Sequence, residues 1–179
     1  MNLVDHFLDE VKIFSLKRFE DSRGFFLENY HKERYLDFGI LDNFIQDNHS
    51  RSKKNVLRGL HFTINKPQSQ LMTVISGKVF DVVVDIRPNS KNFGKFYSCI
   101  LSSDGVQQIY MPNGFAHGFC VLSDRADLHY KVSKFYHHED EKGILWCDEE
   151  INIQWPIINP TISSRDLEHP SLANFFDLI

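Results

Sequence analysis

The chain has 179 residues, of which 42% are hydrophobic and 25% are charged, and its formal net charge is -4. This length predicts one domain over residues 1–179, long enough to bury a substantial core. The slightly acidic balance argues against nucleic-acid binding, which needs a concentrated basic face, and no apolar run approaches the length of a transmembrane helix.

The N-terminus and the cysteines indicate the compartment. The first ten residues, MNLVDHFLDE, lack the basic and apolar regions of a secretory signal. Cys99, Cys120 and Cys147 are odd in number and widely spaced, with no CxxC pair. Free thiols in a reducing cytoplasm are the simplest interpretation, so we expect a cytoplasmic protein.

The predicted elements are mainly short strands. A helix is expected over residues 31–38, with Gly39 as its C-terminal stop. The strand-like segments begin at Phe44 and include NVLRGLHF, LMTVI, VFDVVVDIR, KFYSCIL, VQQIYM, FAHGFCVL and ADLHYKVSKFY. Their spacing of roughly 8 to 14 residues favours a β-sandwich or barrel over a βαβ protein. The basic run from Arg51 to Lys54 is interpreted as a solvated loop.

Arg58 and His61 stand out inside the strand VLRGLHF, because charged groups are costly to bury unless they are paired or used. Residues three apart point to opposite faces of a regular strand. Both side chains can therefore serve one pocket only if the strand is irregular, and Gly59 is the expected place for that irregularity.

The segment VFDVVVDIR has two different faces. Its even-numbered positions from Phe80 to Ile86 are apolar, whereas its odd-numbered positions from Val79 to Asp85 alternate valine with aspartate. The odd-numbered face either lines a cavity of mixed polarity, as in a jelly roll, or belongs to an edge strand whose charges discourage aggregation. The pattern leaves both open.

The C-terminal part has fewer strand signals. GILWCDEEINIQWP places Trp146 and Trp155 near the end of the β region. A short turn of helix is expected to start at Ser163 or Ser164, and the tail SLANFFDLI is expected to dock apolar side chains on the body.

His61 and His117 are the strongest candidates for proton transfer, because the imidazole pKa lies near neutral pH. Satisfied core histidines are the alternative for both. No HxH pair suggests a transition-metal site, and there is no GxSxG elbow, GxGxxG loop or Walker loop. We therefore expect proton-transfer chemistry with no metal and no bound cofactor.

Six ordered motifs carry a resemblance, namely FEDSRGFFLE, QDNHS, NVLRGLHF, GKVFDVVVDIR, MPNGFAHGF and GILWCDEEINIQWP. Over residues 12–170 the chain resembles the dTDP-4-dehydrorhamnose 3,5-epimerase family. The resemblance implies an all-β, cupin-type jelly roll (double-stranded β-helix) with a few short peripheral helices. It also implies a cytoplasmic homodimer that exchanges N-terminal strands and needs no metal.

The resemblance implies an epimerase acting on a nucleotide-linked 4-keto-6-deoxy sugar. A base removes the proton next to the ketone, and an acid returns a proton from the opposite face. The family's base corresponds to His61, its orienting carboxylate to Asp166 and its acid to Tyr130. The carboxylate would fix the tautomer of the ring, and the phenol has a proton to donate at neutral pH.

Five polar residues correspond to the family's ligands for the diphosphate and the sugar. Arg23 and Arg58 resemble the diphosphate ligands, and Arg165 stands where a lysine is common. Guanidinium forks suit phosphate oxygens. Gln46 and Asn48 match positions that contact the sugar.

Five more residues correspond to other positions around the family's site. Phe26, Glu28 and Tyr136 resemble base-recognition positions, and His117 and Asp81 match positions around the catalytic pocket. For all of these ligands and neighbours the alternative is structural packing or a surface pair.

Gln70 is a departure, because the family often carries a lysine there to stabilise the enolate. A neutral amide donates a hydrogen bond but offers no full charge. The sequence thus leaves open dTDP or GDP, hexose or heptose, and inversion at C3 alone or at C3 and C5. Two other functions stay open, a nucleotide-sugar 3,4-ketoisomerase and a catalytically silent binding protein.

Overall fold

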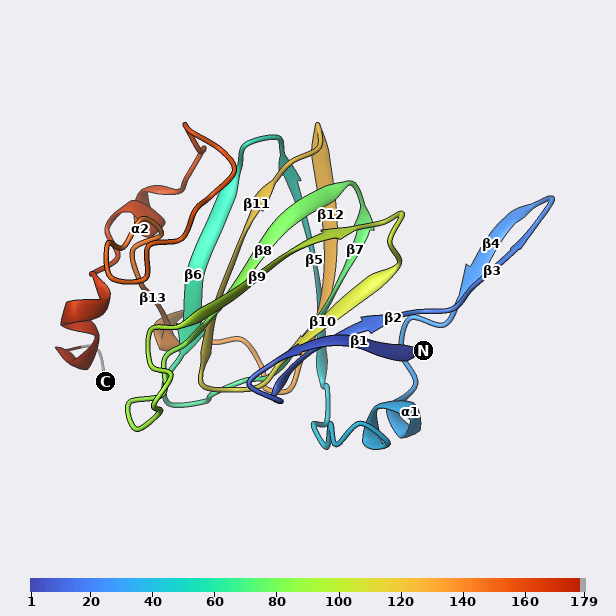
Figure 1. The fold of residues 1–179 in the computed structure, drawn as a ribbon, viewed down its shortest axis with the longest axis horizontal. Helices are drawn as coiled ribbons and strands as arrows, with labels where there is room; N and C mark the ends of the chain where they lie inside the picture. The colour runs from blue at the N-terminus through green and yellow to red at the C-terminus, as the bar shows by residue number, and fades with distance from the viewer. Residues whose placement is uncertain (178–179) are drawn as a thin grey trace.

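The computed structural model describes residues 1–177, and most of its regular structure is β-strand (Figure 1). One sheet has six strands in the order β1 (Asn2–Phe7), β2 (Val11–Ser15), β10 (Gln107–Met111), β7 (Gln70–Ser76), β12 (Arg125–Val132) and β5 (Gln46–Lys53). A second has five strands in the order β13 (Glu141–Gly143), β6 (Leu57–Thr63), β11 (Phe115–Val121), β8 (Lys78–Asp85) and β9 (Phe96–Ser102). The predicted mainly-β architecture is confirmed.

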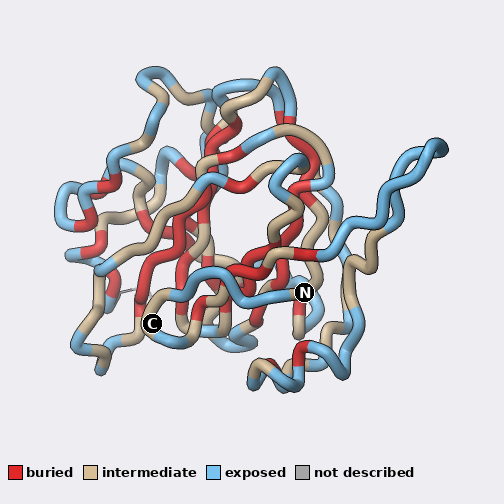
Figure 2. Tube along the Cα trace, turned by 45° about the vertical axis from the view of Figure 1, so that its right-hand side comes forward, coloured by how far each residue is buried: buried red, intermediate tan, exposed pale blue. Residues whose placement is uncertain are grey.

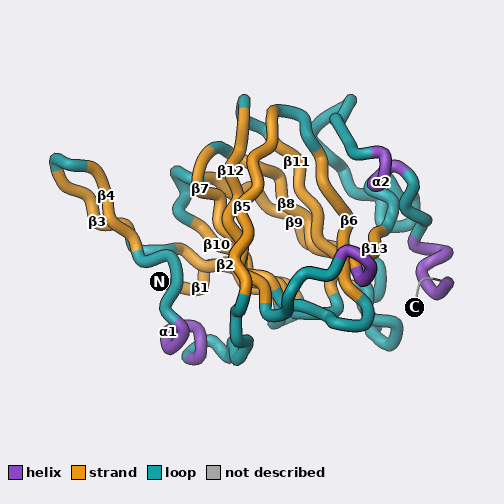
Figure 3. Tube along the Cα trace, turned by 180° about the vertical axis from the view of Figure 1, so that it is seen from behind, coloured by secondary structure: helices purple, strands orange, loops and turns teal. Residues whose placement is uncertain are grey.

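The helices are short and lie at the periphery (Figure 3). They are α1 (Lys32–Leu36), η1 (His138–Asp140), α2 (Ser164–Leu167) and η2 (Leu172–Asp177). The expected helix near residues 31–38 is confirmed, and Gly39 follows it with a φ of 76°. No helix within residues 1–177 is long and apolar enough to span a membrane.

Residues 1–177 contain three clusters of buried apolar side chains, and the buried residues lie mainly along the strands of the two sheets (Figure 2). The first lies between the two sheets and includes Val79 and Val83. The second lies on the outer face of the five-stranded sheet, where Leu172 and Phe175 cover it. The tail therefore docks as expected over the described residues, while residues 178 and 179 lie outside them.

Strand β8 has neighbours on both sides, β11 and β9. Val82 and Val84 enter the cluster under the C-terminal segment, whereas Val79 and Val83 enter the cluster between the sheets. The edge-strand interpretation of β8 is therefore wrong. Its odd-numbered face is the inner one, and Asp81 is buried there.

Strand β6 is irregular where expected. His117 pairs with His61 and Phe119 pairs with Arg58, so three residue steps on β6 oppose two on β11. Gly59 has a φ of 118° and a cis peptide bond joins it to Leu60. The extra residue places Arg58 and His61 on the same cavity, which confirms the predicted irregularity at Gly59.

The basic run was interpreted wrongly as a loop, since β5 continues to Lys53. Arg51 lies in this strand and its Nε donates to Asp127 on β12 at 2.7 Å. The side chain stays exposed, while Ser52 between the two cations is buried. Successive side chains of this edge strand point alternately outward and inward, which explains why the basic residues Arg51 and Lys53 flank a buried serine.

A two-stranded hairpin, β3 (Arg18–Asp21) and β4 (Gly24–Leu27), projects from the body (Figures 1 and 3). Phe19, Phe25 and Phe26 are 51%, 63% and 69% exposed. The residue pattern predicted strands only from Phe44 onward, and the resemblance implied N-terminal strands without giving their bounds, so β1 to β4 were not placed. Within residues 1–177 the hairpin contributes no side chain to the three buried clusters, and its sequence therefore has no one-sided apolar pattern.

Candidate active site

A cavity of about 860 Å³ opens between the two sheets. Strands β5, β7 and β12 line it from the six-stranded sheet, and β6 and β11 line it from the five-stranded sheet. Of the thirteen predicted site residues, ten line this cavity: Gln46, Asn48, Arg58, His61, Gln70, His117, Tyr130, Tyr136, Arg165 and Asp166.

His61 and Asp166 form a hydrogen-bonded pair, with Nε2 of the ring 2.9 Å from Oδ1 of the carboxylate. The second carboxylate oxygen accepts the backbone N–H of Gly59 at 3.2 Å. The helix α2 that carries Asp166 begins after Ser163, whose Oγ accepts the backbone N–H of Asp166 at 3.1 Å. The aspartate is therefore fixed on both sides, and it orients the ring.

The carboxyl group of Asp166 is held ionised. Burial acts to raise its pKa, but the imidazoles of His169 and His61 and the backbone N–H of Gly59 outweigh burial, and the pKa is well below 3.8. An ionised carboxylate accepts a proton-bearing Nε2 and leaves Nδ1 as the nitrogen with a free lone pair.

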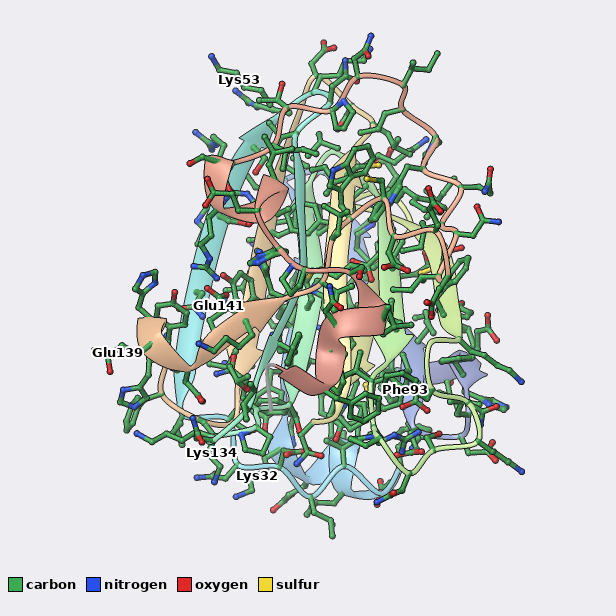
Figure 4. All side chains as sticks on the ribbon, turned by 90° about the vertical axis from the view of Figure 1, so that its left-hand side faces the viewer. Lys32, Lys53, Phe93, Lys134, Glu139 and Glu141 are labelled. Atoms are coloured by element: carbon green, nitrogen blue, oxygen red, sulfur yellow. The ribbon has the colours of Figure 1, made fainter. Side chains whose placement is uncertain are left out.

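Glu141 lies beside this free nitrogen, with Oε1 3.9 Å from Nδ1 of His61. It was not among the predicted residues, because the run HEDEKG looks like a charged surface turn. Pairing of β13 with β6 brings it to the cavity, and Figure 4 shows it nearer the centre of the molecule than Glu139. Arg165 and the hydroxyl of Tyr136 both donate to its carboxylate.

Tyr130 lines the cavity from strand β12, in the sheet opposite to His61. Burial raises the pKa of its phenol, and the charge of Glu141 raises it further, while Arg58 lowers it. The hydroxyl therefore carries its proton at neutral pH. A phenol hydroxyl and an imidazole with a free lone pair thus lie on opposite walls of one cavity.

A second histidine–aspartate pair lies next to the first. Nε2 of His117 is 2.8 Å from Oδ2 of Asp81, whose side chain is fully buried. The other oxygen, Oδ1, is buried without a hydrogen-bond partner among the described residues.

The predicted binding residues form a polar rim. The side-chain amide of Gln46 donates to Asn48 at 2.8 Å and accepts the backbone N–H of Tyr136 at 3.0 Å. Nε of Arg58 donates to Ser52 at 3.0 Å, which leaves its other guanidinium nitrogens available. Gln70 lies at the start of β7 and lines the cavity.

Arg23, Phe26 and Glu28 are the three predicted residues that do not line this cavity within residues 1–177. Arg23 is 88% exposed and pairs with Asp21 at 2.6 Å. Phe26 is on the projecting hairpin, and Glu28, just after it, pairs with Arg34 at 2.9 Å.

His169 is a further residue that the sequence did not suggest. Within residues 1–177 one group could hold a metal ion, and it consists of His61, Asp166 and His169, whose ligand atoms lie within 4.8 Å of one another. Asp166 lies in α2, whereas His169 lies just beyond the end of that helix.

Comparisons with known proteins agree with the geometry. A family model described as dTDP-4-dehydrorhamnose 3,5-epimerase matches residues 5–174. The chain is 49% identical to the dTDP-4-dehydrorhamnose 3,5-epimerase of Escherichia coli K12 over 87% of this chain and 85% of the relative. It is 46% identical to the Shigella flexneri protein of the same name, over 93% of both chains.

A solved structure of a related epimerase has a similar sequence identity to this chain and the same fold. The crystal structure of dTDP-6-deoxy-D-glucose-3,5-epimerase from Legionella pneumophila, in complex with dTDP-4-keto-L-rhamnose, superposes with a TM-score of 0.93. The two chains are 44% identical, and the match covers 96% of this chain and 93% of the other.

Proposed function

The chain belongs to the dTDP-4-dehydrorhamnose 3,5-epimerase family, and from that premise we propose that it inverts both C3 and C5 of a dTDP-linked 4-keto-6-deoxyhexose in the cavity between its sheets. Its general activity is that of an isomerase, an epimerase of a nucleotide-linked 4-keto-6-deoxy sugar. The resemblance and the cupin-type jelly roll expected from the motifs are confirmed.

The observation that carries the proposal is the placement of His61, with its carboxylate, and Tyr130 on opposite walls. A 4-keto group acidifies the C–H bonds at C3 and C5, and loss of such a proton gives an enolate. Inversion requires that the next proton arrive from the other face. Nδ1 of His61 takes the proton, and the phenol of Tyr130 supplies the new one.

Oxyanion stabilisation is assigned to the amide of Gln70 at the cavity wall. Gln70 and His117 line the cavity, and the side-chain amide of Gln70 offers an N–H to the developing oxygen charge. Because the amide carries no full charge, its contribution is smaller than that of an ammonium group.

The diphosphate is assigned to Arg58 and Arg165 at the rim, because guanidinium groups bind phosphate oxygens through paired N–H donors. Gln46 and Asn48 are assigned to the sugar, and Tyr136 to the base. A dTDP ligand is supported by the Legionella pneumophila complex, whose bound molecule is a dTDP-linked 4-keto sugar.

We assign a homodimer in which the β3–β4 hairpin of one copy completes the cavity of the other. The support is that Arg23 and Phe26 are exposed on a hairpin that projects from the body (Figure 1), and that neither lines the cavity of its own chain. A free hairpin with three exposed phenylalanines is also an unstable arrangement for a lone monomer. A single domain over residues 1–179 and a cytoplasmic location stay predictions.

The test is deuterium exchange in D2O, followed by NMR, with dTDP-4-keto-6-deoxyglucose as substrate and the GDP-linked and heptose analogues beside it. We expect deuterium at both C3 and C5 of the dTDP-linked hexose, and no exchange with His61→Asn. Exchange at C3 alone would contradict inversion of both carbons, and preference for GDP would contradict the nucleotide.

The same experiment separates the two alternatives. A product with its carbonyl at C3 would indicate a 3,4-ketoisomerase. Saturable binding of the substrate without any exchange would indicate a silent binding protein.

A further inference from the structure

We propose that His61, Asp166 and His169 form a binding site for a transition-metal cation such as Zn²⁺ or Co²⁺, and that an occupied site prevents epimerisation. The site rests on the geometry of these three side chains. Only its inhibitory effect rests on the proposed role of His61 as the base.

The three ligand atoms have the spacing of a metal's coordination shell. Oδ1 of Asp166 is 2.9 Å from Nε2 of His61 and 3.6 Å from Nε2 of His169, and no pair in the group exceeds 4.8 Å. Ligands of tetrahedral zinc, bonded at about 2.0–2.2 Å, lie about 3.3–3.5 Å from one another. To reach that spacing, the 2.9 Å pair must open by about half an ångström. The nitrogens of the two rings, which are no more than 4.8 Å apart, must come to the same distance from each other.

Besides lowering the pKa of the Asp166 carboxyl, His169 has no assigned role among the described residues. Its side chain is only 10% exposed, and Nε2 is buried without a hydrogen-bond partner among residues 1–177. Its 3.6 Å separation from the carboxylate of Asp166 is too long for a hydrogen bond. Buried polar atoms are nearly always satisfied, so an unpaired nitrogen facing a carboxylate calls for a ligand.

The fold holds His169 in this position. Its ring packs against Gly143, where an added Cβ would lie 2.3 Å from both Nε2 and Cδ2. It also meets the ring of His61 edge to face, with centroids 5.6 Å apart. The absence of a side chain at Gly143 thus leaves room for the imidazole beside Asp166.

The chemistry of the donor set selects the class of cation. Two imidazole nitrogens and one carboxylate oxygen suit zinc, cobalt, nickel or copper, whereas magnesium and calcium prefer oxygen ligands. Oδ2 of Asp166 is held by the N–H of Gly59, so Oδ1 is the oxygen directed at both rings. Since His61 and Asp166 line the cavity, a fourth ligand can be a water molecule there.

Metal binding would disable the base by changing its tautomer. In the metal-free pair, Nε2 of His61 carries the proton and Nδ1 has the free lone pair. A metal on Nε2 needs that lone pair, so the ring proton moves to Nδ1 and no net proton is lost. Nδ1 can then no longer accept a proton from the sugar.

Binding is tested on the tag-free, full-length protein with Co²⁺, whose visible absorption reports its coordination, and with Zn²⁺ by competition. His169→Ala and His169→Gln should each weaken Co²⁺ binding at least tenfold. His6→Ala is the matched control, because His6 and Asp9 form an exposed pair with the same spacing, and it should bind as the unmodified chain does. Circular dichroism checks that the variants are folded. Two different replacements of His169 are made so that the test still stands if one of the variants does not fold.

Absence of Co²⁺ binding at millimolar concentration, or equal binding by both His169 variants, would overturn the site. Inhibition is tested separately by adding Zn²⁺ to the deuterium-exchange assay. Exchange should stop and return after chelation, and each His169 variant should resist inhibition at least tenfold better, relative to its own metal-free rate. Tight Co²⁺ binding without inhibition would refute the effect on His61 while leaving the site intact, and a chain without any exchange activity would refute the proposed function alone.

Discussion

His61 on β6 and His117 on β11 are direct cross-strand partners, yet each is bonded to a different buried aspartate. Asp166 reaches His61 from the C-terminal segment at 2.9 Å, and Asp81 reaches His117 from the neighbouring strand β8 at 2.8 Å. Two similar pairs therefore lie side by side on one wall of the cavity. The structure makes them a matched set for testing which imidazole is the base.

Replacing each aspartate by asparagine distinguishes the two pairs. We expect Asp166→Asn to lower the exchange rate by about 10²–10⁴, because the amide no longer fixes the tautomer or supports a positive ring. Asp81→Asn should lower it about tenfold or less, because it alters a neighbour of the reacting ring. Steady-state deuterium exchange measures both, and a larger loss in Asp81→Asn would move the base to His117.

Tyr130→Phe separates abstraction of the proton from inversion. Without the phenol the opposite wall has no acid, so inversion should fall by about 10²–10⁴. His61 can still remove a proton and return a solvent deuteron on the same face. We therefore expect NMR to show deuterium in substrate of unchanged configuration, and equal losses of exchange and inversion would contradict this division of roles.

Gly59 is tested by stability. A Cβ there would lie 2.5 Å from Cα of Gly118 and 2.6 Å from the carbonyl oxygen of His117, at a φ of 118°. Gly59→Ala should lower the free energy of unfolding by about 3 kcal/mol or more, from strain and overpacking together. Gly39→Ala is the control, because its φ is 76° and a Cβ there meets no described atom within 4 Å. This control should lower the free energy of unfolding by only the backbone strain of a positive φ, about 1–2 kcal/mol. Denaturant unfolding measures both variants.

Most strands from β6 to β12 could be predicted because they bury one or both faces against the chain's own core. Strand β5 was not placed, because only Ser52 in it is buried. The irregularity of β6 could be predicted as well. Arg58 and His61 are three residues apart, so a regular strand would point them to opposite faces, and Gly59 between them permits the bulge. Strands β3 and β4 could not, because their four residues apiece bury almost nothing within this chain.

The site was predictable only in part. Its three catalytic assignments came from a resemblance, because no spacing rule connects His61 with Asp166 across 105 residues. Glu141 and His169 were missed, since an acidic turn and an isolated histidine carry no pattern of their own. Their roles depend on strand pairing and on the space left by Gly143, which exist only in the folded chain.

Asp85 is expected to make stability depend on acid pH. Burial acts to raise its pKa, but hydrogen bonds from Arg87 and Ser90 lower it below 3.8 in the folded state. A lowered folded-state pKa adds stability that is complete above the unfolded value and is lost as the pH falls through the folded one. Asp85→Asn should therefore flatten the fall in unfolding free energy between about pH 5 and pH 3. Asp104→Asn, in an exposed turn, should leave the profile unchanged, and parallel profiles for all three proteins would contradict the assignment.

Mixing two inactive variants tests whether the hairpin acts on the partner's cavity. Arg23→Ala damages only the hairpin, and His61→Asn damages only the cavity, so each homodimer should lose most activity. In a mixed dimer the intact hairpin of the His61→Asn copy meets the intact cavity of the Arg23→Ala copy. With random subunit exchange at equal amounts, half of the dimers are mixed and each has one working cavity. About a quarter of all cavities should thus regain activity.

The contradictory outcome is equally clear. If the hairpin acts on its own chain or on no site, the mixture will have the mean activity of the two parents. Arg125→Ala, an exposed arginine at the start of β12, replaces Arg23→Ala in the control mixture. That variant should be fully active alone. In its mixture with His61→Asn, each cavity with an intact His61 should stay active and each cavity with the His61→Asn substitution should be inactive, whichever copy is the partner.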